Sequence, residues 1–383
     1  MGCIFIFILL FLKITKLIVP NFPYLVAKAS YEYYEEQKKM QAFHIDTKAG
    51  SFTNVVHKKN NKQATYVLII GESTNKNHLG IYDYYRPTTP NLKKRKEELL
   101  IYKDVISSHA YTIGSLQEAL TLNNFKEEDE SSLVQLMNQA GFKTFWFSNQ
   151  RPIGPFESLV TKISRASSVY KYTNSAMAGS STPYDEVLLP YLDEALKDPA
   201  PKKFIILHIL GTHLKYKDRF PESFKKFTEK PKTKFNSALA ISRRNDYDNA
   251  VLYNDYIIEQ VIAKVEKKKE SSYVFYFADH GEEMYEVRDF AGHLDENPTK
   301  GMFEIPFILW RSEKFIENSK LTLDTNRAYV LDDFIHSLSD LSQIDFKERR
   351  LDKSIFSKNF KPKERVIGNG INFDTFDWEI NEE

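Results

Sequence analysis

The sequence predicts an α/β fold in which helices flank a doubly wound, mostly parallel sheet. Three apolar runs support this fold class: residues 66–70, 204–210 and 273–277 are rich in β-branched and aromatic residues. Runs of this kind are typical of strands buried on both faces, as in a parallel sheet covered by helices. Segments with helical spacing alternate with the runs, which is the pattern of a doubly wound sheet.

Each of the three runs ends on a residue that can bind a metal ion or a phosphate. Glu72 follows the first run, Gly211-Thr212-His213 follows the second, and Asp279-His280 follow the third. The ligand sites of open α/β sheets lie beyond the carboxyl ends of the strands. We therefore expect these side chains to gather on one edge of one sheet and to form a metal-dependent active site.

The first 25 residues are mostly apolar, with a continuous run from Cys3 to Leu12 that Lys13 and Lys16 interrupt. This run is shorter than the ~20 apolar residues that a membrane-spanning helix needs. We interpret residues 1–25 as the remnant of a last membrane helix or as a marginal anchor, and residues 26–64 as an interfacial helix and a linker. The alternative is a buried N-terminal helix of a soluble protein.

Local signals predict the elements that follow. Two prolines make the segment Arg86–Pro90 a rigid loop, and Pro190 should kink or split a helix over residues 185–197. We also expect helices at residues 116–122, 131–140 and 245–268, and a strand at residues 143–147 after Gly141. The predicted catalytic domain spans residues 65–350, and residues 351–383 form a C-terminal tail.

Composition narrows the function classes. The chain of 383 residues carries 53 Lys plus Arg against 52 Asp plus Glu, and its basic residues are scattered in mixed runs. This balance argues against nucleic acid as a partner. Cys3 is the single cysteine, which excludes disulfides in the globular part and zinc sites built from cysteine.

The Asp279-His280-Gly281 sequence is the sharpest local signal, because adjacent Asp and His side chains offer an oxygen and an imidazole nitrogen to one divalent ion. A structural turn is the alternative for this sequence, and a helix cap is the alternative for Glu72. His213 could contact a phosphate, donate a proton or bind metal. His293 lies in a loop, where functional residues are frequent.

The other histidines have less context. We expect His208, in the middle of a strand, to pack or to hydrogen-bond internally. We treat His44, His57 and His78 as surface residues.

A nucleophile is expected in the hydroxyl-rich segment Ser107–Ser115, which precedes a helical run. A hydroxyl at the start of a helix lies near backbone N–H groups that favour an anion. Metal coordination could then lower its pKa enough for attack on phosphorus. The alternative is an ordinary helix N-cap.

Taken in chain order, these motifs resemble those of the phosphoethanolamine transferases, which are membrane-anchored members of the alkaline phosphatase and sulfatase superfamily. The resemblance covers residues 65–345. It rests on Gly71-Glu72-Ser73, Arg86-Pro87-Thr88-Thr89-Pro90, the segment around Thr112, Tyr184-Asp185-Glu186-Val187-Leu188-Leu189, Leu207–His213 with Arg219-Phe220-Pro221, Tyr247-Asp248-Asn249-Ala250 with Tyr253-Asn254-Asp255, and Asp279-His280-Gly281-Glu282.

The resemblance implies a zinc site made of Glu72, Asp279, His280 and Thr112, with Thr112 also the nucleophile. His213 and His293 would contact the transferred phosphoryl group, protonate the leaving oxygen or hold a second zinc ion. It further implies that phosphatidylethanolamine gives its headgroup to Thr112. A lipid A, lipooligosaccharide, glycan or protein acceptor then takes this group at the periplasmic face of the inner membrane.

The chain departs from the family in three respects. We expect a shortened membrane region, disulfides like those of many relatives cannot form, and the segment around His293 differs from the usual His-Gly pattern. A phosphoglycerol transferase, a phosphatase, a sulfatase and a non-catalytic remnant are the alternatives. A sulfatase is disfavoured, because no Cys/Ser-x-Pro-x-Arg motif surrounds Thr112.

Overall fold

In the computed structural model, seven of the described strands form one sheet in the order β3-β11-β8-β2-β7-β5-β6. Their bounds are β2 (Ala64–Gly71), β3 (Leu99–Ile101), β5 (Lys143–Ser148), β6 (Val169–Tyr172), β7 (Lys202–His208), β8 (Ser271–Ala278) and β11 (Phe307–Arg311). Strand β11 runs antiparallel to β3 and β8, and the other pairings in this sheet are parallel. The prediction of a mostly parallel sheet is confirmed.

The structure describes residues 44–58, 63–122, 131–152, 159–174 and 182–378, together with Tyr31 and Tyr34. The anchor expected at residues 1–25 lies outside this set. Within the described residues, no helix has both the length and the apolar character needed to cross a bilayer. Residues from Ile45 onward form one compact unit.

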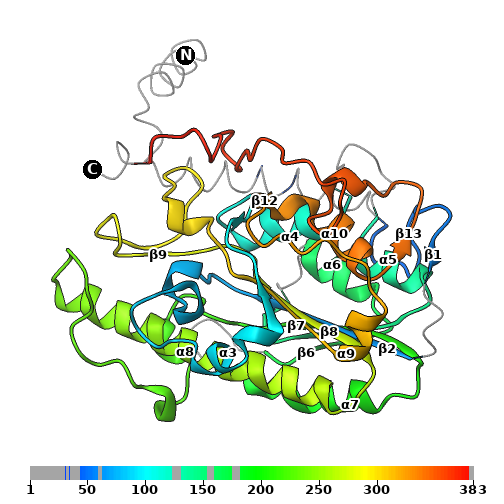
Figure 1. Ribbon diagram of the computed structural model, residues 1–383. Coiled ribbons are helices and arrows are strands. Elements are labelled where there is room, and N and C mark those ends of the chain that lie inside the picture. Colours follow the sequence, from blue (N-terminus) through cyan, green and yellow to red (C-terminus); the bar gives the residue numbers. More distant parts are fainter. Residues whose placement is uncertain are drawn as a thin grey trace, which may run out of the picture. The chain divides into compact units, whose positions relative to one another are not determined.

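Helices cover both faces of the sheet (Figure 1). Helices α3 (Pro90–Lys94), α7 (Leu189–Lys197) and α8 (Ala238–Glu266) lie on one side, and α4 (Thr112–Leu120), α5 (Leu133–Gln139), α6 (Leu159–Arg165) and α10 (Phe334–Leu341) lie on the other. Successive side chains of β2 point to opposite faces of the sheet, which explains this arrangement. Val67 and Ile69 pack in one core cluster with Val251 of α8, whereas Tyr66 stacks on Tyr273.

Smaller elements complete the unit. Three two-stranded ladders pair β1 (Val56–His57) with β13 (Ile344–Asp345), β4 (Val105–Ile106) with β12 (Tyr329–Val330), and β9 (Glu283–Met284) with β10 (Ala291–Gly292). Helix α9 (Glu313–Glu317) follows β11. Within the expected tail, Ile367 and Phe373 pack in one cluster with Phe303, so this part of the tail covers the domain.

Local signals placed most elements well. Gly141, at φ +84°, follows α5, and β5 begins at Lys143 as expected. Pro190 separates a 3-10 helix, η4 (Asp185–Leu188), from α7, which confirms the predicted split. Helix α8 begins seven residues earlier than expected, because the Ser237 hydroxyl caps it by accepting from the Ala240 N–H at 3.1 Å.

The prediction that His78 is a surface residue is wrong. Its side chain is fully buried, and Nδ1 lies 2.6 Å from an oxygen of Asp248 on α8. His57 is also partly buried, where it packs edge-on against Phe142. His44 is exposed as expected. The charged partner of His78 lies 170 residues away along the chain, so no local signal in the sequence could reveal it.

Candidate active site

The register of the two central strands brings the first two acidic candidates together. Gly71 of β2 pairs with Ala278 of β8, so Glu72 and Asp279 are the next residues of the two neighbouring parallel strands. The Asp279 N–H donates to the Gly71 carbonyl at 3.1 Å, which carries the pairing one residue further. Both carboxylates therefore lie at the carboxyl edge of the sheet, where ligand sites of such sheets occur.

Backbone contacts orient Asp279 and His280. Asp279 Oδ1 accepts from the N–H groups of Ser73 at 3.1 Å and His280 at 2.8 Å. His280 Nδ1 lies 2.8 Å from the Gly281 carbonyl, and because a carbonyl can only accept, Nδ1 carries the proton. A backbone carbonyl that fixes the tautomer in this way is typical of metal-binding histidines.

These contacts leave two potential ligand atoms without a hydrogen bond to any described residue. His280 Nε2 lies 3.2 Å from Glu72 Oε1 and 3.6 Å from Asp279 Oδ2. Neither Nε2 nor Asp279 Oδ2 has a hydrogen-bond partner among the described residues, although both atoms are buried. Ligand atoms of Glu72, Asp279 and His280 all lie within 4.8 Å of one another. Buried polar atoms without partners are costly, so this group is suited to a cation that would satisfy them.

The electrostatics of the three groups support this interpretation. Burial and the neighbouring Glu72 charge raise the pKa of Asp279 to about 8. Burial alone would lower the pKa of His280, but Asp279 and Glu72 outweigh it and raise this pKa to about 10. Burial would raise the pKa of Glu72, but its close contact with the positively charged His280 imidazole holds this pKa well below the usual range. A divalent cation would replace the protons that the site otherwise holds.

The Thr112 hydroxyl contacts the Glu72 carboxylate of this group. Thr112 is the first residue of α4, and its hydroxyl donates to Glu72 Oε1 at 3.2 Å and to Oε2 at 3.1 Å. The helix begins here and not at Leu116 as expected. Tyr111 is the N-cap residue and makes no side-chain cap, so the N-cap interpretation does not apply to Thr112. The Ser115 hydroxyl donates to the Asp279 carbonyl and ties the helix to β8.

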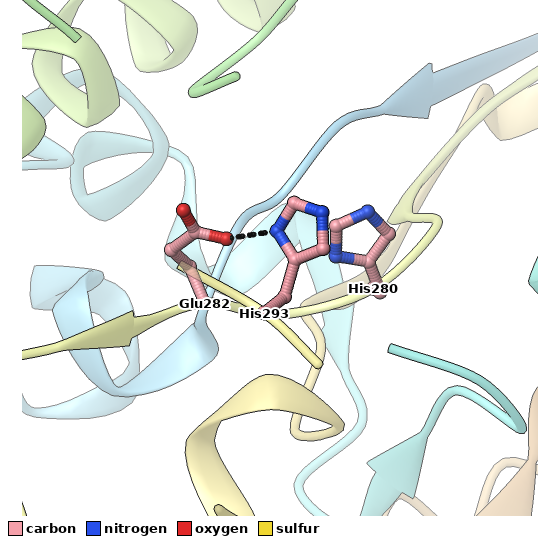
Figure 2. A group of neighbouring side chains, drawn as sticks. All are labelled: His280, Glu282 and His293. Atoms are coloured by element: carbon pink, nitrogen blue, oxygen red, sulfur yellow. Dashed lines mark hydrogen bonds and ion pairs between the residues drawn. The ribbon is translucent and has the colours of Figure 1, made fainter. Parts of the chain in front are cut away.

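His293 lies beside His280, with ring centroids 4.3 Å apart (Figure 2). Its Nδ1 is 2.6 Å from Glu282 Oε2, and the other Glu282 oxygen accepts from the Tyr216 hydroxyl. His280, Glu282 and His293 form a second group with ligand atoms within 4.8 Å. Because both Glu282 oxygens already have partners, this group has less need of a cation than the first.

His213 follows β7 on a loop that is bonded to Glu72. The Thr212 N–H donates to the Glu72 carbonyl at 3.1 Å, and the Thr212 hydroxyl donates to the same carbonyl at 2.9 Å. His213 is close enough for its charge to help lower the pKa of Glu72. His208 is buried in β7 and packs edge-on against Trp146, and burial lowers its pKa to about 4. The expected internal role of His208 is confirmed.

Three residues that contact the predicted site were not among the candidates. Gln150 Nε2 donates to Glu72 Oε2 at 3.0 Å. Glu282 accepts hydrogen bonds from His293 and from the Tyr216 hydroxyl. The sequence does contain a signal for Gln150: β5 ends on Ser148, so the polar residues after it fall on the same edge of the sheet as Glu72. Glu282 belongs to the Asp-His-Gly-Glu motif, but its contact with His293 depends on the fold of the loop between them.

A mixed sheet with two carboxylates, an imidazole and a hydroxyl at its carboxyl edge is the arrangement expected of the alkaline phosphatase and sulfatase superfamily. The family model described as Sulfatase matches residues 64–344.

Comparisons with individual proteins narrow this class. The chain is 37% identical to phosphoethanolamine transferase EptC of Escherichia coli O18:K1:H7 over 91% of this chain and 63% of the relative. It is 30% identical to Kdo(2)-lipid A phosphoethanolamine 7''-transferase of E. coli K12, over 67% of this chain and 46% of that protein.

A solved structure is similar over its full length. The zinc complex of the C-terminal periplasmic domain of EcEptC from E. coli has a TM-score of 0.82 and 35% identity, over 88% of this chain and 100% of that one. The chain therefore belongs to the sulfatase family and, within it, to the phosphoethanolamine transferases. It spans 63% of the length of the EptC relative, and it matches the periplasmic domain of that protein type.

Proposed function

We propose that this chain is the catalytic part of a zinc-dependent transferase. It moves phosphoethanolamine from phosphatidylethanolamine to an acceptor in the cell envelope through a phosphorylated Thr112. The observation that carries the proposal is a pair of buried atoms, Asp279 Oδ2 and His280 Nε2, which have no hydrogen-bond partner among the described residues and lie next to Glu72 and the Thr112 hydroxyl. Glu72, Thr112, Asp279 and His280 would hold the zinc ion.

The donor set fits one zinc ion. Two carboxylates, one neutral imidazole nitrogen and one hydroxyl oxygen are ligands that zinc accepts in a four-coordinate site. When bound, zinc lowers the pKa of a coordinated hydroxyl and neutralises charge on the phosphoryl oxygens. The second group, around Glu282, has satisfied oxygens, which favours one ion over two.

The proposed reaction has two steps. In the first, the Thr112 oxygen attacks phosphorus, the bond from phosphorus to the diacylglycerol oxygen breaks, and that oxygen takes a proton. Thr112 gives up its own proton, for which Glu72 is the hydrogen-bond acceptor. In the second step an acceptor oxygen attacks the phosphorus and releases the proton that it carries, the bond from phosphorus to the Thr112 oxygen breaks, and the threonine regains a proton.

His293 and His213 supply the proton and contact the phosphoryl group. Glu282 accepts from the His293 Nδ1–H, which leaves Nε2 as the atom that faces a substrate. His213 is a half-buried residue on the Glu72 side of the site, and its pairing with His293 would place one imidazole on each side of the phosphoryl group.

The acceptor and the location come from the relatives. One relative is a Kdo(2)-lipid A transferase, and a solved relative is a periplasmic domain. We infer that the acceptor is lipid A, lipooligosaccharide or another envelope glycan or protein. By the same inference, the catalytic domain acts at the periplasmic face of the inner membrane, where its lipid donor is found.

The direct test is the intact mass of the purified protein after incubation with zinc and phosphatidylethanolamine, followed by peptide mapping. A phosphoethanolamine adduct on Thr112 is expected. An adduct from phosphatidylglycerol in its place would support a phosphoglycerol transferase. Bound zinc with no adduct from either lipid would overturn the proposal and support a phosphatase or a non-catalytic remnant.

A further inference from the structure

Asp185 is a buried carboxylate outside the predicted zinc ligands. It accepts hydrogen bonds from the loop between β7 and His213. It begins η4 and is 2% exposed. Oδ1 accepts from the Leu210 N–H at 2.7 Å, and Oδ2 accepts from the Gly211 N–H at 2.9 Å. Asn149 donates to Oδ1 at 2.9 Å. Asp185 therefore binds two consecutive amides that end two residues before His213.

The loop that Asp185 holds also contacts the backbone of Glu72. Gly211 has φ +55°, and a Cβ at this position would lie 2.9 Å from both the nitrogen and the carbonyl oxygen of Glu72. The Thr212 hydroxyl donates to the carbonyls of Glu72 and Ser73 at 2.9 and 2.8 Å. The chain between β7 and His213 is thus held by Asp185 through its N–H groups and packed closely against the Glu72 loop.

Two different sets of contacts thus hold the loop that carries His213 in place. The Glu72 side supports the loop by close packing and neutral hydrogen bonds. The Asp185 side supports it by hydrogen bonds to a carboxylate, which are shorter and stronger than neutral ones. The charge of Asp185 also interacts with the buried guanidinium of Arg219, which lies on the segment after this loop.

We propose that Asp185 is a positioning residue for the transfer reaction: it fixes the backbone at Leu210 and Gly211 and thereby holds His213 at the phosphoryl group. The inference rests on the proposed function for the role of His213. Misplacement of a catalytic group by about 1 Å costs roughly 100-fold in rate. Loosening this loop should therefore slow the transfer step and leave the metal site intact.

The first test is Asp185→Asn, which keeps the size of the side chain and replaces one acceptor oxygen by a donor that faces an N–H group. We expect adduct formation on Thr112 at saturating lipid to slow by about 10- to 100-fold, with unchanged zinc content and unchanged lipid concentration at half-maximal rate.

Asp255→Asn is the matched control. Asp255 is 1% exposed and accepts from the N–H groups of Asn91 and Leu92, both at 2.9 Å, at the start of α3, which carries no site residue. This substitution should also destabilise the protein but should leave the rate of adduct formation unchanged. Equal slowing in both variants would overturn the proposal, because it would indicate a general effect of lost stability.

A double-mutant cycle with His213→Ala decides whether Asp185 acts through His213. If it does, adding Asp185→Asn to His213→Ala should slow the reaction less than two-fold further. A second loss as large as in the wild-type background would show an independent effect and would overturn the proposal.

Amide hydrogen exchange tests the positioning without any turnover. Exchange at Leu210 and Gly211 should be faster in Asp185→Asn than in the wild-type protein and should be unchanged in Asp255→Asn. If the wild-type protein forms no adduct, the proposed function fails by itself, and unchanged exchange at these two amides would still overturn the role of Asp185. If Asp185→Asn does not fold, Asn149→Ala removes the side chain that anchors the carboxylate, and the same exchange result is expected.

Discussion

Replacing His78 by glutamine should remove a stabilisation of about 2 kcal/mol that the protein has in weak acid and loses as the pH rises through about 8. His78 Nδ1 lies 2.6 Å from Asp248 Oδ1, and Nε2 lies 3.2 Å from Glu286 Oε1. Burial by itself would lower the pKa of this imidazole, but the two carboxylates outweigh it and raise the pKa from 6.5 to about 8.

The sign and the size follow from this shift. Because the pKa of His78 is higher in the folded than in the unfolded protein, the folded state binds the proton more tightly. The stabilisation is therefore complete below about pH 6.5 and is lost as the pH rises through about 8. The difference between about 8 and 6.5 is about 1.5 pKa units, which at 1.36 kcal/mol per unit gives about 2 kcal/mol.

The assay is urea unfolding of the wild-type protein and of His78→Gln at several pH values between about 5.5 and 9.5. The difference between the two free energies of unfolding cancels groups that titrate in both proteins, such as His109, whose pKa is raised to about 9 by Asp295 and Glu118 against the effect of burial. This difference should fall by about 2 kcal/mol from the acidic to the alkaline end. A difference that is independent of pH, or that grows with pH, would refute the reasoning.

Three substitutions at the site have separate expected outcomes. Thr112→Ala should abolish the adduct in intact-mass measurements while zinc content and the circular dichroism spectrum stay unchanged, and a remaining adduct would require another nucleophile. Asp279→Asn should lower zinc occupancy, measured by elemental analysis after dialysis, and full occupancy would contradict the ligand assignment. Gly211→Ala should lower the free energy of unfolding by at least ~1–2 kcal/mol, because φ is +55° and the new Cβ would meet the Glu72 backbone; an unchanged urea midpoint would contradict this.

Much of the sheet and its functional edge was predictable from local sequence. The apolar runs at residues 66–70, 204–210 and 273–277 are typical of strands buried in a parallel sheet; β2 and β8 include the first and the third, and β7 includes the second as far as His208. The carboxyl ends of parallel strands meet at one edge, so the sequence alone was enough to place Glu72 and Asp279 together. Pro190 and Gly141 marked element ends because their backbone restrictions are intrinsic.

Contacts between distant residues were not predictable in this way. The burial of His78 depends on Asp248, which lies 170 residues further along the chain, and the Gln150 contact depends on Glu72, 78 residues away. The antiparallel direction of β11 depends on where the chain re-enters the sheet. The burial of His78 and the direction of β11 leave no periodic or compositional signal, and the end of β5 indicates only the sheet edge on which Gln150 lies.

The sequence by itself determined which strands are buried and which polar residues lie at their carboxyl ends, because hydrophobic runs and strand direction decide both. Only the tertiary structure decided which atoms of those residues remain free. Asp279 Oδ1 and His280 Nδ1 are hydrogen-bonded to backbone groups, whereas Asp279 Oδ2 and His280 Nε2 have no hydrogen-bond partner among the described residues. This difference depends on the exact positions of atoms from segments that are far apart in the sequence, such as Ser73 and Asp279.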